Sequence, residues 1–311
     1  MRDVTEMKWV GWFFGVCAMC MALAVFAGFA GGLHPAFDTL ALARPALALL
    51  CLLALVLPMG RHRRLSLALA AIVGLGSTIP LMLGGGADGN LRVYSKNLWF
   101  ANASVDAVAA DIRDSGADLV LLQEVSSRNR MLLAAVSEVY PHQHVCQFSG
   151  WSGLAVLARV PIMETDCTAR RGAAAALIAS DAGPVWAVSV HLAWPFPYSN
   201  AQTGDAVSDL VAGLEGPVVL GGDFNIFPWA GSVRQIQSAA DLQVARPVRP
   251  TFDSRGVPLL LDHVHAPGGG TASYRPLLGS DHLGVLADVW VTAPSGPDHA
   301  GTSSGSRTRL R

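Results

Sequence analysis

Three long apolar stretches open the chain, and short apolar runs follow them. The stretches cover residues 9–30, 39–59 and 65–83, and only the second contains a charged residue, Arg44. Each is long enough to cross the roughly 30 Å hydrocarbon core of a bilayer as a helix. We therefore expect three transmembrane helices, with Arg44 either reaching the membrane interface or facing the other helices. A cleaved signal peptide is the alternative for the first stretch, but no small-residue cleavage site stands out after it.

The pattern changes after residue 84. Residues 85–90 predict a flexible Gly-rich linker between a membrane domain at 1–84 and a second domain at 91–292. In the second domain, the alternating segment 91–98 predicts a first strand, and apolar runs bounded by turn or charged residues predict buried strands at 118–123, 154–158, 185–190 and 217–221. Helices are predicted at 105–115, 129–139, 203–214 and 232–240. Strands mixed with helices favour a layered α/β domain. The tail at 293–311 has almost nothing to bury, so we expect it to be disordered.

Composition and charge support this division. The 311 residues are 51% hydrophobic and only 14% charged, which is too apolar for a single soluble domain. Residues 90–292 contain 13 Lys and Arg against 18 Asp and Glu, a net charge of −5. A protein dedicated to duplex nucleic acid usually has a basic footprint, so this balance argues against that class.

Basic residues near the apolar stretches predict the orientation in a plasma (inner) membrane. The connection at 31–38 contains no Lys or Arg, whereas Arg2, Lys8, Arg61, Arg63 and Arg64 all lie on the other side. Short cytoplasmic loops carry the excess of Lys and Arg, so the N-terminus is expected in the cytoplasm. Three crossings then place the second domain in the periplasm or extracellular space. Oxidation could join its two cysteines, Cys146 and Cys167, although two buried thiols are an equal alternative.

Polar residues follow several predicted strands. Strand ends that converge on one edge would bring these side chains together on a rigid support. Carboxylates, imidazoles and amides in one place suit the metal-assisted attack of water on a phosphate ester, although each residue alone is explicable as a solvated or loop group. The set comprises Asn97, Gln123, Glu124, His191, Asp223, Asn225, Asp262, Asp281 and His282.

The residue types indicate separate roles. A hard divalent cation prefers oxygen ligands and needs only one or two carboxylates, and Glu124 is the first candidate. Asp223 could orient or deprotonate water, and the Asn225 amide could donate to a phosphate oxygen. A neighbouring aspartate could fix the tautomer of His282, which would then stabilise charge or move a proton.

The order of these motifs resembles the endonuclease/exonuclease/phosphatase superfamily, which includes deoxyribonuclease I. The similarity spans residues 91–291 and includes Ser152-Gly153-Leu154, Gly222-Asp223-Phe224-Asn225, Leu261-Asp262-His263 and Ser280-Asp281-His282. The resemblance implies a four-layer α/β sandwich, in which helices flank two mixed central sheets. It also implies hydrolysis of phosphodiester or phosphomonoester bonds with Mg²⁺ or Mn²⁺.

The resemblance further implies a role for each matched residue. Glu124 would hold the metal with Asp281 as a second carboxylate, and Asp262 would orient a histidine. The catalytic residues would be His191, Asp223, Asn225, Asp281 and His282, and the substrate-binding residues would be Asn97, Asn225 and His191.

Two departures from the family narrow the substrate. Trp99 stands where some nucleases have an acidic residue, and no tyrosine matches the one that apurinic endonucleases use, so DNA repair is disfavoured. A nuclease for external nucleic acid and an enzyme for lipid or small phosphoesters both stay open.

Two other classes of function compete with the enzyme. A non-catalytic, membrane-tethered binding module would have lost catalytic residues, and none of the main set is missing. A small transporter would need more polar residues in its spans than Arg44. No obligate protein partner is expected.

Overall fold

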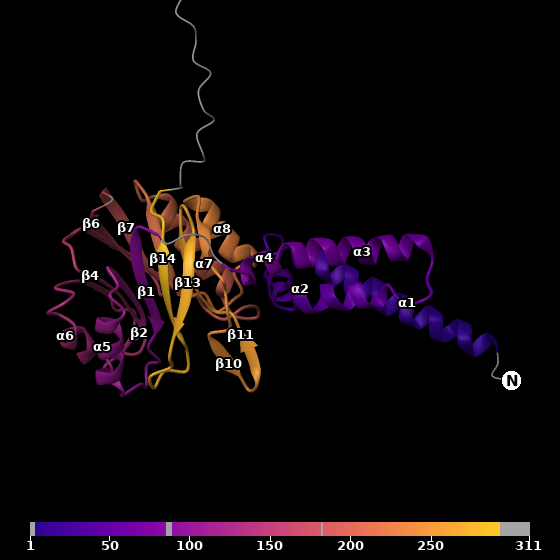
Figure 1. Cartoon of the computed structure of the whole chain (residues 1–311), viewed down its shortest axis with the longest axis horizontal. Coiled ribbons are helices and arrows are strands. Elements are labelled where there is room, and N and C mark those ends of the chain that lie inside the picture. Colours follow the sequence, from indigo (N-terminus) through magenta and orange to yellow (C-terminus); the bar gives the residue numbers. More distant parts are fainter. Residues whose placement is uncertain (1–3, 85–88, 182, 293–311) are drawn as a thin grey trace, which may run out of the picture.

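The computed structural model describes residues 4–84, 89–181 and 183–292, with side chains from residue 12 onward. A helical arm leads into a domain of strands and helices (Figure 1). The predicted tail at 293–311 and residues 85–88 of the predicted linker lie outside the described residues.

Helices α1 (Val4–Ala27), α2 (Pro35–Ala54) and α3 (Arg61–Gly76) form the arm, and α4 (Ile79–Met82) links it to the domain. The helices meet through small buried side chains, among them Ala22, Ala48 and Ala71. At Gly74 a Cβ atom would collide with the Ala48 methyl group. Small residues let helices approach closely, as they do in membrane bundles.

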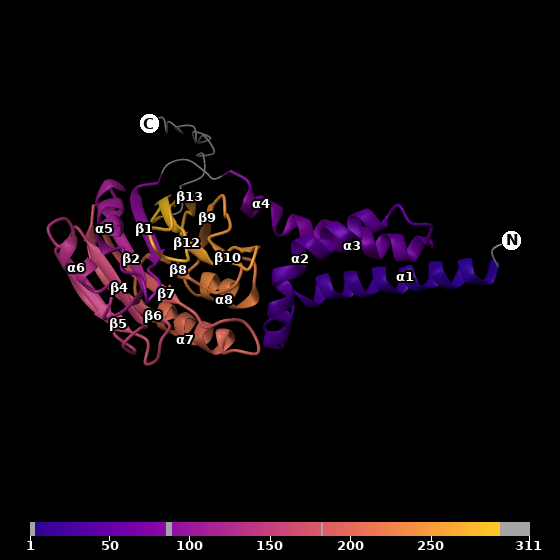
Figure 2. The same ribbon diagram turned by 90° about the horizontal axis from the view of Figure 1, so that it is seen from below.

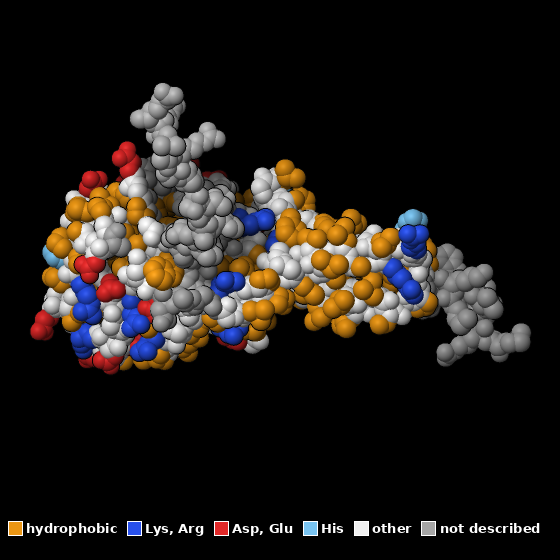
Figure 3. Space-filling model, turned by 45° about the horizontal axis from the view of Figure 1, so that its top comes forward, with side chains coloured by type: hydrophobic (Ala, Val, Ile, Leu, Met, Phe, Trp, Pro, Cys, Tyr) orange, Lys and Arg blue, Asp and Glu red, His pale blue; other side chains and the backbone are white. Residues whose placement is uncertain are grey.

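The number of candidate membrane spans is a correction to the sequence analysis. Among the residues whose side chains are described, Pro35–Ala54 and Arg61–Met82 are long and apolar enough to cross a membrane, and Trp12–Ala27 is the described apolar part of α1. Two candidate spans are thus found there, against the three predicted. The first helix ends at Ala27, before the predicted boundary at residue 30, because the chain turns at Gly28. The visible surface of the arm is mostly hydrophobic, and Lys and Arg side chains gather at its far end (Figure 3).

Arg44 occupies neither a lipid-facing nor a water-facing position. Its side chain is fully buried where the arm meets the domain, and it donates hydrogen bonds to the carbonyl groups of Gly28 and Trp229. The guanidinium also lies 3.7 Å from the centre of the Phe29 ring. The N-terminal half of α2, up to Arg44, therefore packs against the domain.

Twelve strands of the domain are hydrogen-bonded in the order β3-β4-β2-β1-β14-β13-β9-β12-β8-β7-β6-β5, and β10 and β11 form a separate hairpin. The strands are β1 (Leu91–Asn97), β2 (Leu119–Val125), β3 (His142–Cys146), β4 (Gly153–Ala158), β5 (Ile162–Cys167), β6 (Ala173–Ser180), β7 (Gly183–His191), β8 (Val218–Asp223), β9 (Gln243–Arg246), β10 (Phe252–Ser254), β11 (Val257–Leu259), β12 (Asp262–Ala266), β13 (Gly270–Arg275) and β14 (Gly284–Val289).

The large sheet folds into two facing layers. Val93 and Leu121 of one layer share a buried cluster with Ala187 and Val219 of the other. The prediction of two separate sheets is a second correction, because the short β9 pairs with β12 on one side and, through two residue pairs, with β13 on the other.

Helices cover both outer faces of the folded sheet. Helices α5 (Val105–Asp114) and α6 (Met131–Ala135) pack on the layer of β1, β2 and β4, and α7 (Asn200–Ala212) and α8 (Gly231–Ala239) pack on the other layer, beside α2 (Figure 2). The predicted mixed α/β fold with flanking helices is confirmed. Helix α6 begins after the predicted start at residue 129, because the Asn129 side chain accepts from the Ser126 N–H and donates to the Glu124 carbonyl, and it ends at Ala135, before the predicted end at residue 139.

Cys146 and Cys167 end the two outermost strands of the sheet, β3 and β5. A disulfide joins them, with a Cα–Cα distance of 6.0 Å. The bond ties the two free edges of the folded sheet together.

Candidate active site

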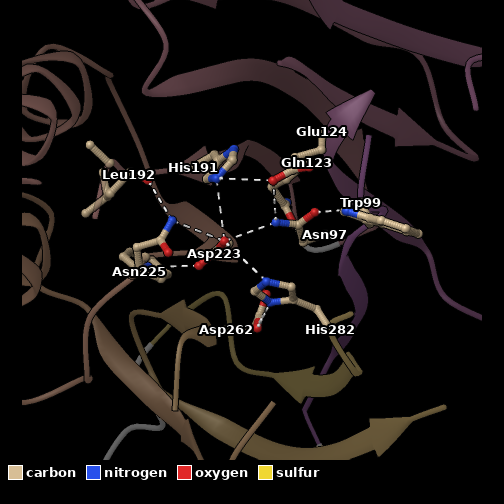
Figure 4. A network of polar contacts seen from close by, with 12 residues as sticks. Asn97, Trp99, Gln123, Glu124, His191, Leu192, Asp223, Asn225, Asp262 and His282 are labelled. Carbon is tan, nitrogen blue, oxygen red and sulfur yellow. Dashed lines mark hydrogen bonds and ion pairs between the residues drawn. The ribbon is translucent and has the colours of Figure 1, made fainter. Parts of the chain in front are cut away.

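The register of the strands brings the polar residues to one edge of the sandwich. Asn97 on β1 stands opposite Gln123 on β2, while His191 on β7 and Asp262 on β12 both stand opposite Asp223 on β8. The two groups come from the two facing layers, and their side chains point toward one another (Figure 4).

Glu124 lies at the end of β2, directly before its last residue, where the sequence predicted a strand end. The pairing of β2 with β4 shifts between Leu122 and Val125, and Glu124 has a φ of 56°. Bulges of this kind redirect a side chain, and strained backbone is concentrated at functional sites. The Glu124 carboxylate accepts hydrogen bonds from Asn97 Nδ2 at 3.3 Å and from Phe100 N at 2.8 Å. Burial raises the pKa of Glu124, although these two hydrogen bonds oppose the shift.

Asp223 is the centre of the network and is 1% exposed. Its Oδ1 accepts from Asn225 N at 2.8 Å, and its Oδ2 accepts from Asn97 Nδ2 at 3.0 Å. The same Oδ2 lies 3.5 Å from His191 Nε2 and 3.8 Å from His282 Nε2. Burial raises the pKa of Asp223 to about 7, against the opposing charge of His282. A base that titrates near neutral pH is well matched to proton transfer.

Strand β8 reaches this position because residue 222 is glycine. A Cβ atom at Gly222 would collide with the Val190 carbonyl oxygen on β7, and Gly222 has a φ of 156°. The absence of a side chain therefore permits the β7–β8 pairing that aligns His191 with Asp223.

His282 is paired with Asp262. Its Nδ1 donates to Asp262 Oδ2 at 2.8 Å. The other ring nitrogen, Nε2, faces Asp223. Burial alone would lower the pKa of His282, but the charges of Asp262 and Asp223 raise it to about 10. The ring is therefore an imidazolium at neutral pH. The Ser280 hydroxyl joins its segment to β1, because it donates to the Asn97 carbonyl and accepts from His282 N.

His191 differs from His282 in its charge. Burial lowers the pKa of His191 well below its usual value, and the charges of Arg171 and His282 act in the same direction. The neutral ring can donate from Nε2 toward Asp223, and its Nδ1 has no hydrogen-bond partner among the described residues. The two histidines thus present one neutral and one charged ring to the same carboxylate.

The structure brings together seven of the residues predicted for the site, and Asp281 stands apart from them. Asp281 is exposed, and its charge raises the pKa of Glu124 through space. Gln123 turns to the other layer, where its Nε2 donates to Ser189 Oγ at 3.0 Å. The seven are Asn97, Glu124, His191, Asp223, Asn225, Asp262 and His282.

Two residues that support His282 were not among those predicted from the sequence. Lys96 is fully buried, and its Nζ donates to the His282 carbonyl at 3.0 Å. The ring of Phe252 lies 4.7 Å from the imidazole, centre to centre. A lysine within a strand predicted to be buried, directly before Asn97, was a usable signal, whereas nothing in the sequence marks Phe252.

The donor set fits a hard divalent cation. Within the network Glu124 offers a carboxylate, and cations such as Mg²⁺ bind through one or two carboxylates while keeping several waters. Asp223, Asp262 and His282 form a second set, with ligand atoms within 4.8 Å of one another. A protonated His282 ring has no lone pair for a cation, which disfavours this second set and leaves Glu124 as the ligand within the network.

Comparison with known families identifies the domain. The model of the endonuclease/exonuclease/phosphatase family matches residues 94–285, more than half of the chain. The chain belongs to this family. The match contains all seven residues of the network, as the order of the motifs predicted. No curated protein matches the chain.

Solved structures share the fold at low sequence identity. An endonuclease/exonuclease/phosphatase family protein from Leptotrichia buccalis has a TM-score of 0.51 at 17% identity, over 64% of this chain and 99% of that one. Beta toxin from Staphylococcus aureus, a double mutant with bound magnesium ions, has a TM-score of 0.51 at 15% identity, over 65% and 100%. Truncated Caenorhabditis elegans TDP2 has a TM-score of 0.51 at 17% identity, over 63% and 96%. At these identities the likeness shows the fold.

Proposed function

We propose that the chain is a membrane-anchored, divalent-metal-dependent phosphoesterase that cleaves its substrate by attack of an activated water. One observation carries the proposal. The Asp223 carboxylate is buried between Asn97, a neutral His191 and a charged His282, in a member of the endonuclease/exonuclease/phosphatase family.

Each residue has a role that its contacts support. Asp223 accepts a proton from the attacking water, because its pKa of about 7 lets it gain and lose a proton near neutral pH. The His282 imidazolium, held by Asp262, stabilises the negative charge that develops on the phosphoryl oxygens. His191, Asn97 and Asn225 contact the scissile phosphate.

We assign the metal to Glu124 and keep Asp281, which is exposed outside the network, as the second carboxylate that the family resemblance implies. When bound, Mg²⁺ or Mn²⁺ would polarise the phosphoryl group and offset its charge. The bound magnesium ions of the beta toxin structure support this choice for the same fold.

The arm favours an extracytoplasmic domain. Arg61 and Arg64 are exposed at the start of α3, at the end of the α2–α3 pair opposite to the domain (Figure 1). Because basic loops stay in the cytoplasm, the domain lies on the other side of the membrane. The Cys146–Cys167 disulfide is consistent with that compartment.

The first prediction tests the enzyme itself. Purified full-length chain in detergent should hydrolyse bis(p-nitrophenyl) phosphate with Mg²⁺ and lose this activity in EDTA. Glu124→Gln and His282→Asn should each lower kcat on the order of 100-fold or more, because each removes a charge used at the transition state.

Two exposed or partly exposed residues provide matched controls. Glu138→Gln and His142→Asn make the same chemical changes away from the site, and each should keep kcat within about twofold. A folded wild-type protein with no metal-dependent turnover of aryl phosphates, DNA, RNA or phospholipids would instead favour the non-catalytic binding module.

A further inference from the structure

A cavity lies between the arm and the domain, directly beside the candidate active site. Its volume is about 220 Å³. One wall is Thr39 and Leu42 of α2, and the opposite wall is the loop that follows β7, with Trp194 and Phe196. The floor includes Asn225, so one lining residue belongs to the active-site network.

Asn225 connects the cavity to the chemistry. Its Nδ2 donates to the Leu192 carbonyl at 2.9 Å and lies 3.3 Å from Asp223 Oδ2. Asn225 therefore borders both Asp223 and the cavity. A phosphate beside Asp223 would have its ester substituent at the mouth of an apolar space.

The helix wall of the cavity continues along α2 toward the arm's exposed surface. At 100° per residue, Thr39, Leu42, Leu49 and Leu53 share one face of the helix. Leu49 and Leu53 are 48% and 57% exposed, in a helix that is long and apolar enough to cross a membrane. A continuous apolar stripe thus runs from a lipid-accessible surface to the cavity.

The loop wall is aromatic and partly exposed. Trp194 and Phe196 are 41% and 45% exposed, and the Thr39 hydroxyl donates to the Phe196 carbonyl at 3.4 Å. The ring of His34, just before α2, makes an edge contact with Phe196 at 5.5 Å between centres. Helix and loop are therefore joined at the rim, and both present apolar groups to the space between them.

We propose that this cavity binds the hydrocarbon portion of an amphiphilic phosphoester whose phosphate reaches Asn225. The inference rests on the proposed function and names its substrate class. An apolar cavity of about 150 Å³ takes up benzene, so 220 Å³ has room for a short stretch of hydrocarbon chain. The net charge of −5 over residues 90–292 disfavours a polyanion as the alternative substrate. Helix α2 is then part of the substrate site as well as an anchor.

A homologous series of substrates tests this inference. Full-length chain in nanodiscs with Mg²⁺ is assayed on methyl to hexyl p-nitrophenyl phosphates and on thymidine 5′-(p-nitrophenyl phosphate). Because each buried methylene stabilises the complex, kcat/KM should rise about fourfold per methylene, mainly through KM, and level off once the cavity is full. Turnover of all esters without chain-length dependence, or a preference for the nucleotide ester, would overturn the inference and leave the proposed function standing.

Paired tryptophan variants locate the effect. Leu42→Trp fills the cavity, so the ratio of kcat/KM for the hexyl ester over the methyl ester should fall toward one. Leu49→Trp makes the same change on the same helix face outside the cavity and should keep the wild-type ratio. If Leu42→Trp fails to fold, Phe196→Ser removes the opposite wall and should lower the ratio as well. Equal ratios in all folded variants would refute the assignment.

A binding measurement separates the two proposals. Methyl to hexyl phosphonates, which are not hydrolysed, should raise the Tm of the wild type with increasing chain length and lose this trend in Leu42→Trp. If the Tm shows this chain-length dependence but no ester is hydrolysed, the proposed enzymatic function is refuted and the proposed ligand class of the cavity stands. If neither hydrolysis nor the chain-length dependence is observed, both proposals are refuted.

Discussion

The charge of His282 depends on one neighbour. Asp262 accepts its Nδ1 proton at 2.8 Å and is itself 1% exposed. Asp262→Asn keeps the size of the side chain but removes the negative charge, so the pKa of His282 should fall from about 10 toward the ordinary value. Activity that requires the imidazolium should then be lost at lower pH than in the wild type, and kcat should fall on the order of 100-fold or more with little change in KM.

Two measurements check this prediction. The pH–kcat profile should show its alkaline limb at lower pH in Asp262→Asn, and NMR of the His282 ring should show the lowered pKa directly. Asp209→Asn makes the same change at an exposed position of α7 and is the control. It should alter neither the pH–kcat profile nor the pKa of His282. A lowered kcat with an unchanged His282 pKa would mean that Asp262 only shapes the pocket.

The convergence of the candidate-site residues could be predicted from sequence, but the direction of the Glu124 side chain could not. Asp223 and His191 follow apolar runs, and strand ends at one edge had to bring them together. Glu124 points into the same space only because β2 is bulged and residue 124 has a positive φ. That geometry depends on pairing with β4, a contact between distant segments that no local pattern encodes.

At the level of elements, the disulfide joins the two strands that end the hydrogen-bonded order. A Cys146→Ser/Cys167→Ser variant should lower the free energy of unfolding by about 3 kcal/mol, as expected for closing a loop of this length. Urea unfolding of the full-length chain in detergent, followed by tryptophan fluorescence, measures the difference. Dithiothreitol should destabilise the wild type by a similar amount and leave the double variant unaffected.

The unpaired cysteines supply the control for this prediction. Cys20→Ser changes a free, exposed cysteine of α1 and should keep both the stability and the response to dithiothreitol. An equal stability of the double variant and the wild type would show that the edges of β3 and β5 are held by packing alone.

The elements that sequence predicted correctly are those with a strong local pattern. Strands β2, β4, β7 and β8 are buried apolar runs, β1 begins as an alternating segment, and each was predicted to within a few residues. Strand β5 is mostly exposed at an edge, so it has no apolar run to detect, and β6 begins with four alanines that suit a helix equally well. The continuity of the sheet through β9 could not be predicted either, because two residue pairs decide it.

At the scale of the whole molecule, the arm and the domain are joined by specific polar contacts. Asp38 of α2 accepts hydrogen bonds from the backbone N–H groups of Gly231 and Ser232, at the start of α8. The Trp229 indole donates to the Ala41 carbonyl at 2.7 Å, and Arg44 donates to the Trp229 carbonyl at 3.3 Å. The sequence pattern placed Arg44 in a membrane span and Asp38 beside it. It could not predict their contacts with Trp229, Gly231 and Ser232, because these residues lie almost 200 positions later in the chain.

Asp38 therefore acts as an N-terminal cap for α8 that is supplied by another segment. The α8 N-terminus has no side-chain cap of its own, and a carboxylate there satisfies free N–H groups and complements the helix dipole. Asp38→Ala should lower the free energy of unfolding by about 1–2 kcal/mol. Hydrogen exchange should become faster at the Gly231 and Ser232 amides while the amides of α5, on the opposite layer, keep their wild-type rates.

Asp209→Ala on α7 is the matched control, since Asp209 is exposed on a helix of the same layer. It should leave exchange at Gly231 and Ser232 unchanged. Asp38→Asn should fall between the wild type and Asp38→Ala, because the carboxamide oxygen can still accept one hydrogen bond but carries no charge toward the α8 dipole. If Asp38→Ala leaves exchange at both amides unchanged, α2 does not cap α8, and the wall that α2 gives to the apolar cavity would have to be held by Arg44 and Trp229 instead.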